Sequence, residues 1–577
     1  MNYKELYEEW LRIPCFHEET KAVLKAIGND EKEIKERFYK ELEFGTAGLR
    51  GVIGAGINRM NVYTVRKATQ GLANYILKVG GADIGVAIAY DSRRMSPEFA
   101  DVAALCLNAN GIKAYVFESL RPTPELSFAV RELNCIAGIN ITASHNPPEY
   151  NGYKVYWEDG AQITPPHDTG IMSEVKAVTD FASLKTMEKE EAVSAGLYNV
   201  IGKDVDDKYI AELKKQVKRQ DCIDAAKQDL KIVYTPLHGT GNLPARRILK
   251  ELGFENVYVV PDQELPDGEF PTVSYPNPEA AEAFTLALAL AKEKDADLVL
   301  ATDPDADRLG VYVKDSKSGE YITLTGNMSG CLLADYEIGQ IKELKGIPED
   351  GALIKTIVTT NMADAIAKHY GVKLIEVLTG FKYIGQQILG FEQSGKGEYL
   401  FGFEESYGCL IGTHARDKDA IVATMALCEA AAYYKTKNMT LWDAMLAMYE
   451  KYGYYKDDIQ SITLKGIEGL NKIQEILESL RNNTPEKFGK YKVLSARDYK
   501  KDTIRNMETG EVTTTGLPNS NVLYYDLEDG AWLCVRPSGT EPKVKFYYGV
   551  KGSSLEDANA LSAELGKEVI EMINSML

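Results

Sequence analysis

Three aspartates at alternate positions form the densest group of possible metal ligands in the chain. Asp303, Asp305 and Asp307 lie in "DPDADR", directly after the apolar run "LVLAT". Carboxylates this close repel one another unless a hard cation binds them, and alternate spacing lets all three point inward. A calcium EF-hand loop does not fit, because its sixth position, normally glycine, is Arg308 and its twelfth, normally glutamate, is Lys314. The pattern predicts a Mg²⁺ site that keeps positions open for water or a phosphate oxygen.

A serine hydroxyl stands in the sharp polar turn "TASHNP", where His145 follows Ser144 and Asn146-Pro147 supports the turn. Two enzymatic interpretations compete. A hydrolase nucleophile needs an activating base, but "GxSxG" is absent and a sequence-adjacent Ser-His pair is not a triad. A phosphate carrier at Ser144 would instead add phosphate oxygens to the Mg²⁺ shell. A Ser-His pair alone is usually an ordinary turn, but an aspartate loop ending an equivalent strand favours the phosphate carrier.

The segment "RPSGTEPKVK" predicts an anion cradle. Hydroxyls, bare backbone N–H groups at a glycine and a guanidinium fork surround one tight turn. Its members are Arg536, Ser538, Gly539, Thr540, Lys543 and Lys545. The alternative is an exposed basic hairpin, but in a chain of formal net charge -19 such a cluster is informative.

The segment "FEESYG" places Glu404 and Ser406 at another strand end. Carboxylates and hydroxyls suit the hydroxyl groups of a sugar, and the alternative is an acidic helix start. Downstream, "HARDKDA" carries Lys418, a possible proton donor or acceptor if burial and the flanking Asp417 and Asp419 tune it. A lone lysine of this kind is usually a surface ion pair, so Lys418 gains its weight only from the other motifs.

These motifs end strands of a threefold repeat of strand, helix, strand, helix and strand. The first strands lie in 83–93, 229–241 and 351–362, and the third in 135–147, 296–308 and 398–408. The first helix of each unit stops at a glycine: Gly111, Gly253 or Gly371. This order predicts parallel pairing and α/β layers, in which ligands collect beyond the carboxyl ends of the strands.

The character of the chain changes after about residue 456, where short Tyr/Val-rich strands joined by turns such as Asp529-Gly530 predict a smaller antiparallel α+β domain. We therefore expect three similar α/β domains with mixed, mainly parallel sheets and a smaller C-terminal α+β domain. The expected divisions are 1–209 with the serine loop, 210–324 with the metal loop, 325–456 with the sugar loop and 457–577 with the phosphate cradle.

Bulk composition excludes several classes of partner. The 577 residues are 45% hydrophobic and 26% charged, which is ordinary for a globular protein. The charge of -19 argues against nucleic acid or an anionic membrane as main partner. Eight scattered cysteines without C-x-x-C suggest neither a zinc site nor a disulfide framework. Without a signal-peptide pattern or a run of about 18 apolar residues, a cytoplasmic location is expected.

The order of motifs resembles that of the α-D-phosphohexomutase family, which contains phosphoglucomutases and phosphomannomutases. The resemblance covers essentially the whole chain through "GTAGLRG" (45–51), "TASHNP", "DPDADR", "FEESYG" and "RPSGTEPK". It implies four domains around one deep cleft, Ser144 phosphorylated in the resting enzyme, and one Mg²⁺ held by that phosphate and the three aspartates.

The resemblance also implies roles for further residues. His145 shares the catalytic loop of Ser144, Arg50 and Lys154 flank the phosphoryl group, and Lys418 matches the acid/base lysine. The implied substrate-binding residues are Arg308, Thr379, Gly380, Glu404, Ser406, Lys418, Arg536, Ser538, Gly539, Thr540 and Lys545.

The implied activity is an isomerase reaction that interconverts α-D-glucose 1-phosphate and glucose 6-phosphate, with glucose 1,6-bisphosphate as intermediate and activator. Mannose or pentose phosphates are alternative substrates. A metal-dependent sugar-phosphate phosphatase would use the same serine and aspartates, and a catalytically silent sugar-phosphate sensor would bind without turnover. The expected partners are small sugar phosphates, and a monomer or homodimer is expected.

Overall fold

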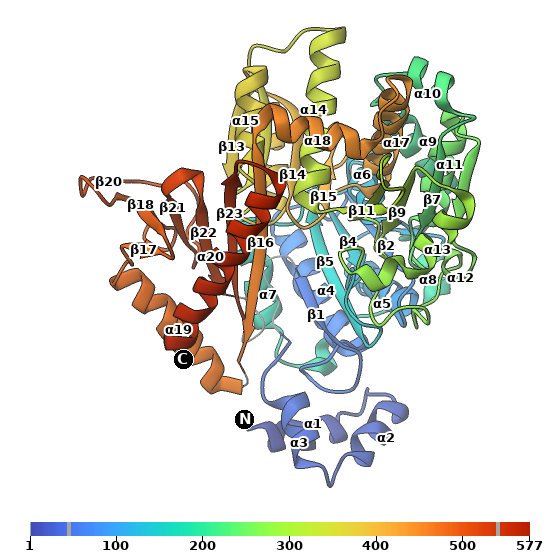
Figure 1. The fold of residues 1–577 in the computed structure, drawn as a ribbon. Helices are drawn as coiled ribbons and strands as arrows, with labels where there is room; N and C mark the ends of the chain where they lie inside the picture. Colours follow the sequence, from blue (N-terminus) through green and yellow to red (C-terminus); the bar gives the residue numbers. More distant parts are fainter. Residues whose placement is uncertain (1, 43–47, 465, 538–542, 577) are drawn as a thin grey trace. The chain divides into compact units, whose positions relative to one another are not determined.

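The computed structural model describes residues 2–42, 48–464, 466–537 and 543–576 (Figure 1). The chain divides into two compact units. The first unit contains Met1–Thr325, Ile384–Lys396 and Ser406–Leu441, and the second contains Gly326–Tyr383, Gly397–Glu405 and Trp442–Leu577.

The first unit begins with three helices, drawn in dark blue in Figure 1, whose hydrophobic core also includes Ala55, Ile57 and Tyr63. They are α1 (Tyr3–Arg12), α2 (Glu18–Ala26) and α3 (Glu31–Phe38). Helix α1 starts with a capping box between Asn2 and Glu5, which satisfies backbone donors at its first turn. Trp10, Phe16 and Phe38 pack edge to face around its buried side. The sequence pattern did not indicate this separate cluster.

The first sheet has the order β1-β5-β4-β2-β3-β6. Its strands are β1 (Gly48–Val52), β2 (Val86–Tyr90), β3 (Ala114–Phe117), β4 (Ala137–Ile141), β5 (Tyr150–Trp157) and β6 (Tyr198–Ile201). The accompanying helices are α4 (Val62–Lys78), α5 (Ser96–Ala109), α6 (Thr123–Glu132), α7 (His167–Ala177), α8 (Lys189–Ser194) and α9 (Lys203–Lys214). The predicted parallel pairing is confirmed, since β2 lies parallel to both β3 and β4. Strand β5 returns antiparallel to β4 and β1.

The second sheet, of order β11-β10-β9-β7-β8, repeats the pattern, with β7 parallel to both β8 and β9. Its strands are β7 (Lys231–Thr235), β8 (Asn256–Val259), β9 (Leu298–Thr302), β10 (Leu309–Lys314) and β11 (Tyr321–Leu324). The helices are α10 (Gln220–Ala226), α11 (Asn242–Leu252), α12 (Pro261–Glu264) and α13 (Thr285–Lys294). Helix α17 (Ala420–Thr436) packs on α10 and α11, and β15 (Gly408–Leu410) precedes it.

In the second unit, β12 (Gly351–Thr356) lies between the parallel strands β13 (Lys373–Val377) and β14 (Glu398–Glu404). Helices α14 (Gly326–Leu344), α15 (Met362–Tyr370) and α18 (Leu441–Tyr452) accompany them. Helix α16 (Lys382–Ser394) lies between β13 and β14 in the chain, and its residues from Ile384 onward belong to the first unit. The strand and helix order of the third repeat is therefore as predicted.

The C-terminal sheet is antiparallel throughout and has the order β16-β23-β22-β21-β18-β19-β20, with β17 paired to β18. The strands are β16 (Tyr454–Thr463), β17 (Lys487–Phe488), β18 (Tyr491–Asp498), β19 (Thr503–Asn506), β20 (Val512–Thr513), β21 (Leu523–Leu527), β22 (Trp532–Pro537) and β23 (Lys543–Gly552). The predicted turn at Asp529-Gly530 joins β21 to β22, and both residues have positive φ.

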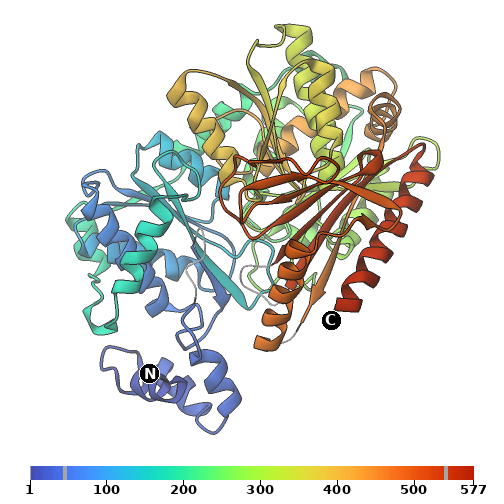
Figure 2. The ribbon, with the colours of Figure 1, turned by 90° about the vertical axis from the view of Figure 1, so that its left-hand side faces the viewer.

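The two faces of this sheet bury different sets of side chains, as the strand period of two requires. Leu533 and Val535 of β22 pack with α19 (Gly466–Asn482) and α20 (Leu555–Met576), both visible beside the sheet in Figure 2. Trp532 and Cys534 point to the opposite face and pack with residues that follow β12 and β13. Both faces are therefore buried within the second unit.

All eight cysteines are free, and Cys15 alone among them is exposed. Among the described residues, none of the helices combines the length and the apolar character needed to cross a membrane.

Candidate active site

Ser144 lies just beyond the carboxyl end of β4 in a backbone conformation that side chains rarely adopt. Its φ is 51°, and its side chain is buried. The Ser144 N–H donates to the Thr142 hydroxyl at 2.8 Å, and the Ser144 hydroxyl donates to Oδ2 of Asp303 at 2.7 Å. The turn therefore presents the hydroxyl directly to the aspartate loop, as the sequence predicted.

A buried arginine that the sequence analysis missed holds this turn in place. The Arg93 guanidinium donates to the carbonyl oxygens of Ser144 at 2.6 Å, Pro147 at 2.8 Å and Tyr150 at 3.1 Å, and also to that of Asn146. Asp91 lies 3.3 Å from its Nε. One guanidinium thus binds four backbone carbonyl groups between residues 144 and 150. The only sequence signal was "DSRR" at the end of the first strand.

The three aspartates lie together and are buried, with one carboxylate oxygen of each within 4.8 Å of the others. Asp303 Oδ1 accepts the backbone N–H groups of Asp307 at 3.1 Å and Arg308 at 3.0 Å. Lys154 Nζ donates to Asp305 Oδ2 at 2.7 Å. Lys154 reaches this loop because it lies on β5 opposite Asn140 of β4.

The donor set fits a hard divalent cation. Oδ1 of Asp305 and Oδ1 of Asp307 are buried and accept no hydrogen bond. Burial and the repulsion of Asp305 and Asp307 raise the pKa of Asp303 well above its usual value. Burial also opposes ionisation of Asp305, but Lys154 and hydrogen bonds outweigh it and lower the pKa of that carboxyl. Three clustered carboxylates, two of which keep a buried oxygen without a hydrogen bond, suit Mg²⁺, which prefers oxygen ligands.

His145 and Arg50 lie beside the serine. His145 Nδ1 is 3.1 Å from the Ser144 hydroxyl, and the pKa of its ring is lowered well below the usual value by burial and by Arg308 and Arg50. Arg50, on β1, donates to Oδ1 of Asn146 at 3.1 Å and so lies at the serine loop.

Lys418 belongs to the same group, although the sequence alone gave it little weight. Its Nζ lies 2.8 Å from Asp417 Oδ1 and 3.3 Å from Asp307 Oδ2. The Tyr156 hydroxyl donates to the other Asp417 oxygen at 2.9 Å, which orients that carboxylate. Asp419 does a different task, since its side chain caps the first turn of α17.

Arg308 follows the metal loop and lies 2.6 Å from Glu279. The predicted substrate-binding role of this side chain therefore involves a guanidinium already held by a carboxylate. Ser406 also falls in the first unit, two residues beyond the end of β14.

The predicted sugar-binding residues of the second unit lie at the carboxyl ends of parallel strands. Gly380, in the loop after β13, donates its N–H to Glu404 Oε1 at 3.1 Å, and Thr379 precedes it. Burial and the neighbouring Glu404 raise the pKa of Glu405 to about 7, opposed by Arg536 and by a hydrogen bond from Thr356. The sequence analysis missed Glu405.

Arg536 and Lys545 face each other on β22 and β23. Both are thus held on neighbouring strands of the C-terminal sheet. Ser538, Gly539 and Thr540 lie outside the described residues, so the predicted turn between these strands remains a prediction.

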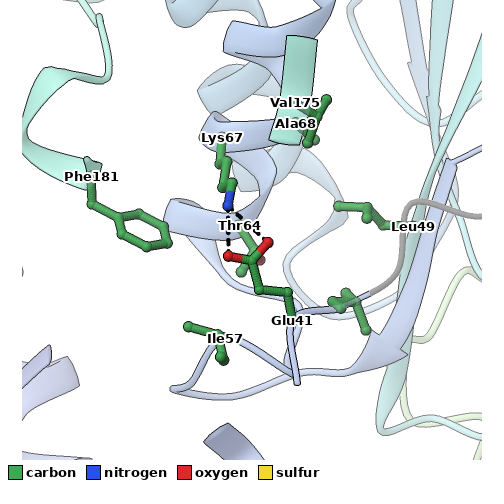
Figure 3. A pocket seen from close by; sticks show the side chains of 9 residues that line it. Glu41, Leu49, Ile57, Thr64, Lys67, Ala68, Val175 and Phe181 are labelled. Carbon is green, nitrogen blue, oxygen red and sulfur yellow. Dashed lines mark hydrogen bonds and ion pairs between the residues drawn. The ribbon is translucent and has the colours of Figure 1, made fainter. Parts of the chain in front are cut away.

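A small cavity elsewhere in the first unit does not compete with this site. It has a volume of about 30 Å³, room for about one water molecule, and contains the ion pair of Lys67 with Glu41 (Figure 3). A sugar phosphate is too large for it.

Comparisons with known proteins agree with this geometry. Four family models match in order: phosphoglucomutase/phosphomannomutase alpha/beta/alpha domain I at residues 41–181, domain II at 207–319, domain III at 325–452 and the C-terminal domain at 484–565. A phosphoglucomutase of Staphylococcus aureus is 36% identical over 538 residues, covering 93% of this chain and 95% of that protein. One from Staphylococcus epidermidis is 37% identical, covering 91% and 94%.

Solved structures share the fold. A putative phosphomannomutase of Thermus thermophilus aligns with a TM-score of 0.68 at 22% identity, covering 92% of this chain and 99% of that chain. The Paramecium phosphoglucomutase parafusin aligns with a TM-score of 0.66 at 19% identity, covering 93% and 96%. The fold is thus that of a multidomain α/β phosphohexomutase, and the expected three α/β domains and C-terminal antiparallel domain are confirmed. The chain belongs to the phosphoglucomutase/phosphomannomutase family and is an isomerase of phosphotransferase type.

Proposed function

We propose that the protein interconverts α-D-glucose 1-phosphate and glucose 6-phosphate through a phosphoserine at Ser144 and a glucose 1,6-bisphosphate intermediate. The observation that carries the proposal is the 2.7 Å hydrogen bond from the Ser144 hydroxyl to Asp303 within the buried aspartate group. The staphylococcal relatives, named phosphoglucomutases and matched over nearly their whole length, support glucose as the sugar.

In this proposal Asp303, Asp305 and Asp307 hold one Mg²⁺ together with the phosphoserine. When bound, the ion would neutralise charge on the phosphate oxygens. Arg50 and Lys154 add positive charge beside the same phosphate, and His145 lies within hydrogen-bond distance of the serine oxygen. These groups stabilise a phosphoryl group whose charge is spread over three oxygens during transfer.

The reaction consists of two transfers at one serine. A sugar hydroxyl attacks the phosphorus of phosphoserine, the bond from phosphorus to Ser144 Oγ breaks, and the hydroxyl proton passes to a base. Lys418 is our candidate for this acid–base role, because its Nζ lies next to the metal loop. The second transfer returns the other phosphate of the bisphosphate to Ser144.

Sugar and distal phosphate recognition is proposed for the second unit, together with Arg308 and Ser406 of the first. Glu404 with Thr379 and Gly380 would bind sugar hydroxyls. Arg536 and Lys545, with Ser538, Gly539 and Thr540, would bind the phosphate that does not react. A carboxylate at a strand end suits sugar hydroxyls, and two cations on neighbouring strands suit a phosphate.

The test is an assay with matched glucose, mannose and pentose 1-phosphates, in which both the 6- or 5-phosphate product and inorganic phosphate are measured. Glucose 6-phosphate with the highest kcat/KM is expected. A preference for mannose or ribose phosphate would move the proposal to another substrate. Release of inorganic phosphate in place of isomer would make the protein a phosphatase.

The remaining assignments belong to the same proposal. Mg²⁺ is the metal, glucose 1,6-bisphosphate the activator, the cytoplasm the location, and a monomer or homodimer the assembly. Domain limits at residues 209, 324 and 456 are likewise proposed, and small sugar phosphates are the expected partners.

A further inference from the structure

We infer that Thr123 is a positioning residue that determines which oxygen of Asp305 faces the metal, and that Asn140 orients Thr123 for this task. The inference rests on the proposed function, because it assigns a role within the same metal site. Thr123 is the first residue of α6, which accompanies the first sheet, whereas Asp305 lies in the loop between β9 and β10 of the second sheet.

The contacts form a short chain of buried groups. The Asn140 side-chain amide donates to the Thr123 hydroxyl at 2.7 Å, and that hydroxyl donates to Asp305 Oδ2 at 2.9 Å. The Thr123 backbone N–H also donates to the Asp305 carbonyl oxygen at 2.8 Å. Neither Thr123 nor Asn140 is exposed to solvent. The Thr123 hydroxyl has a single proton. Because its oxygen accepts from Asn140, that proton points to Asp305.

The two oxygens of Asp305 differ as a result. Oδ2 accepts from both Thr123 and Lys154, whereas Oδ1 is buried and accepts no hydrogen bond. A carboxylate with one oxygen saturated by donors has the other left for a cation. Partners of this kind are known to orient metal ligands, and their loss typically costs about 10 to 100-fold in metal affinity.

Lys154 cannot do this alone. Its long side chain provides a single flexible cation, and its Nζ lies 3.8 Å from Asp307 as well as 2.7 Å from Asp305. The short, β-branched Thr123 side chain is stiffer and bonds only one of the two aspartates through its hydroxyl. We therefore assign to Lys154 the compensation of the aspartate charge, and to Thr123 the orientation of the Asp305 carboxylate.

Three variants distinguish an effect on the orientation of the Asp305 carboxylate from an effect on folding. Thr123→Val keeps the shape and the backbone bond to Asp305 but removes the hydroxyl. Thr123→Ser restores the hydroxyl. Thr69→Val is the matched control, because the Thr69 hydroxyl is equally buried and bonds to the Val65 carbonyl at 2.8 Å and the Tyr153 hydroxyl at 3.1 Å, away from the aspartates.

The measurement is direct binding of Mn²⁺, a paramagnetic substitute for Mg²⁺, to the dephosphorylated full-length protein by electron paramagnetic resonance. We expect the Kd to rise about 10 to 100-fold in Thr123→Val, and to stay within about threefold of wild type in Thr123→Ser and Thr69→Val. The Mg²⁺ concentration for half-maximal turnover should move in parallel, with most of kcat recovered at saturating metal.

Wild-type affinity in Thr123→Val would overturn the inference, and so would an equal loss in Thr123→Ser or Thr69→Val, since either would indicate packing. If Thr123→Val does not fold, Asn140→Ala replaces it, with a Kd increase of about threefold to tenfold expected and no change contradicting us. Because Mn²⁺ binding needs no substrate, a wild type that binds metal but yields no glucose 6-phosphate would sink only the proposed function.

Discussion

The Ser144 hydroxyl carries the chemistry in our proposal, yet its oxygen contributes little to packing. Ser144→Ala removes this one oxygen from a turn that Arg93 holds through backbone carbonyl groups. We expect turnover to fall by more than about a thousandfold, as for other nucleophile deletions, while the thermal unfolding temperature changes little. Intact-mass analysis should show one phosphate on wild type and none on the variant. Phosphate found on the variant would place the carrier elsewhere.

Glu405 predicts a pH dependence of stability. Burial and Glu404 raise its pKa from 4.5 to about 7 in the folded protein. The folded state thus binds the proton more tightly, so the free energy of unfolding falls as the pH rises from about 4.5 to about 7, by at most about 3 kcal/mol. Glu405→Gln cannot ionise and lacks this loss.

Thermal unfolding at about pH 5 and about pH 8 checks this expectation. The stability of Glu405→Gln relative to wild type should increase between the two conditions. A constant difference would mean that Glu405 ionises freely in the folded state.

Residue types and spacing were sufficient to predict the aspartate loop and the serine turn, because each lies directly after a buried strand. The role of Lys154 followed only from the family resemblance. Arg93, Thr123 and Tyr156 were not predictable in this way. They act through contacts with residues 51 to 261 positions away in the chain, and no local pattern encodes such a pair. Lys418 was singled out only through the other motifs and the family resemblance, and its contact with Asp307 depends on the fold.

At the level of elements, the metal loop packs against the turn that precedes α11. The Thr240 N–H donates to the Pro304 carbonyl oxygen at 2.8 Å. A Cβ on Gly239 would lie 2.4 Å from Pro304 Cα, closer than any real contact. This close approach makes the "HGTG" turn part of the surface against which the aspartate loop folds.

Gly239→Ala should therefore displace Pro304 and with it the metal ligands. We expect metal affinity to fall about tenfold, and overpacking to cost about 1 to 3 kcal/mol of stability. Gly390→Ala is the control, because Gly390 lies within α16 with nothing near its Cβ position, and alanine there should stabilise the helix by up to about 1 kcal/mol. Mn²⁺ binding and thermal unfolding are measured for both. Unchanged metal binding in Gly239→Ala would show that the loop does not depend on this turn.

The succession of strands and helices along each of the three repeats was predictable. Buried parallel strands are continuous apolar runs in the sequence, and polar loops end them. The helical cluster of α1 to α3 was not. The first segment carries apolar residues at helical spacing, such as Tyr3, Tyr7 and Trp10. The core that these helices bury also contains Ile57 and Tyr63, however, and no local pattern reveals that contact.

At the level of the whole molecule, the proposed cycle requires the bisphosphate to present each of its phosphates to Ser144 in turn. A group that holds the other phosphate must therefore exist, and Arg536 is our candidate. Arg536→Ala should lower kcat/KM for glucose 1-phosphate and glucose 6-phosphate by up to about a hundredfold, since a charge-assisted hydrogen bond contributes up to about 3 kcal/mol. It should also increase release of glucose 1,6-bisphosphate.

The exposed Arg505 of β19 offers a matched charge deletion in the same sheet. Arg505→Ala should leave both kcat/KM and bisphosphate release at wild-type values. Equal release of glucose 1,6-bisphosphate from wild type and Arg536→Ala, with substrate affinity unchanged, would mean that Arg536 does not hold the distal phosphate.

The distribution of thiols has a practical consequence for labelling. Burial raises the pKa values of Cys106 and Cys135 to about 12, so their thiolates are scarce as well as shielded. A thiol reagent should react rapidly with Cys15 in the folded protein and with all eight cysteines after unfolding. A Cys15→Ser variant that still reacts rapidly would contradict this. A single maleimide dye or surface tether can therefore be attached between helices α1 and α2, without engineered cysteines.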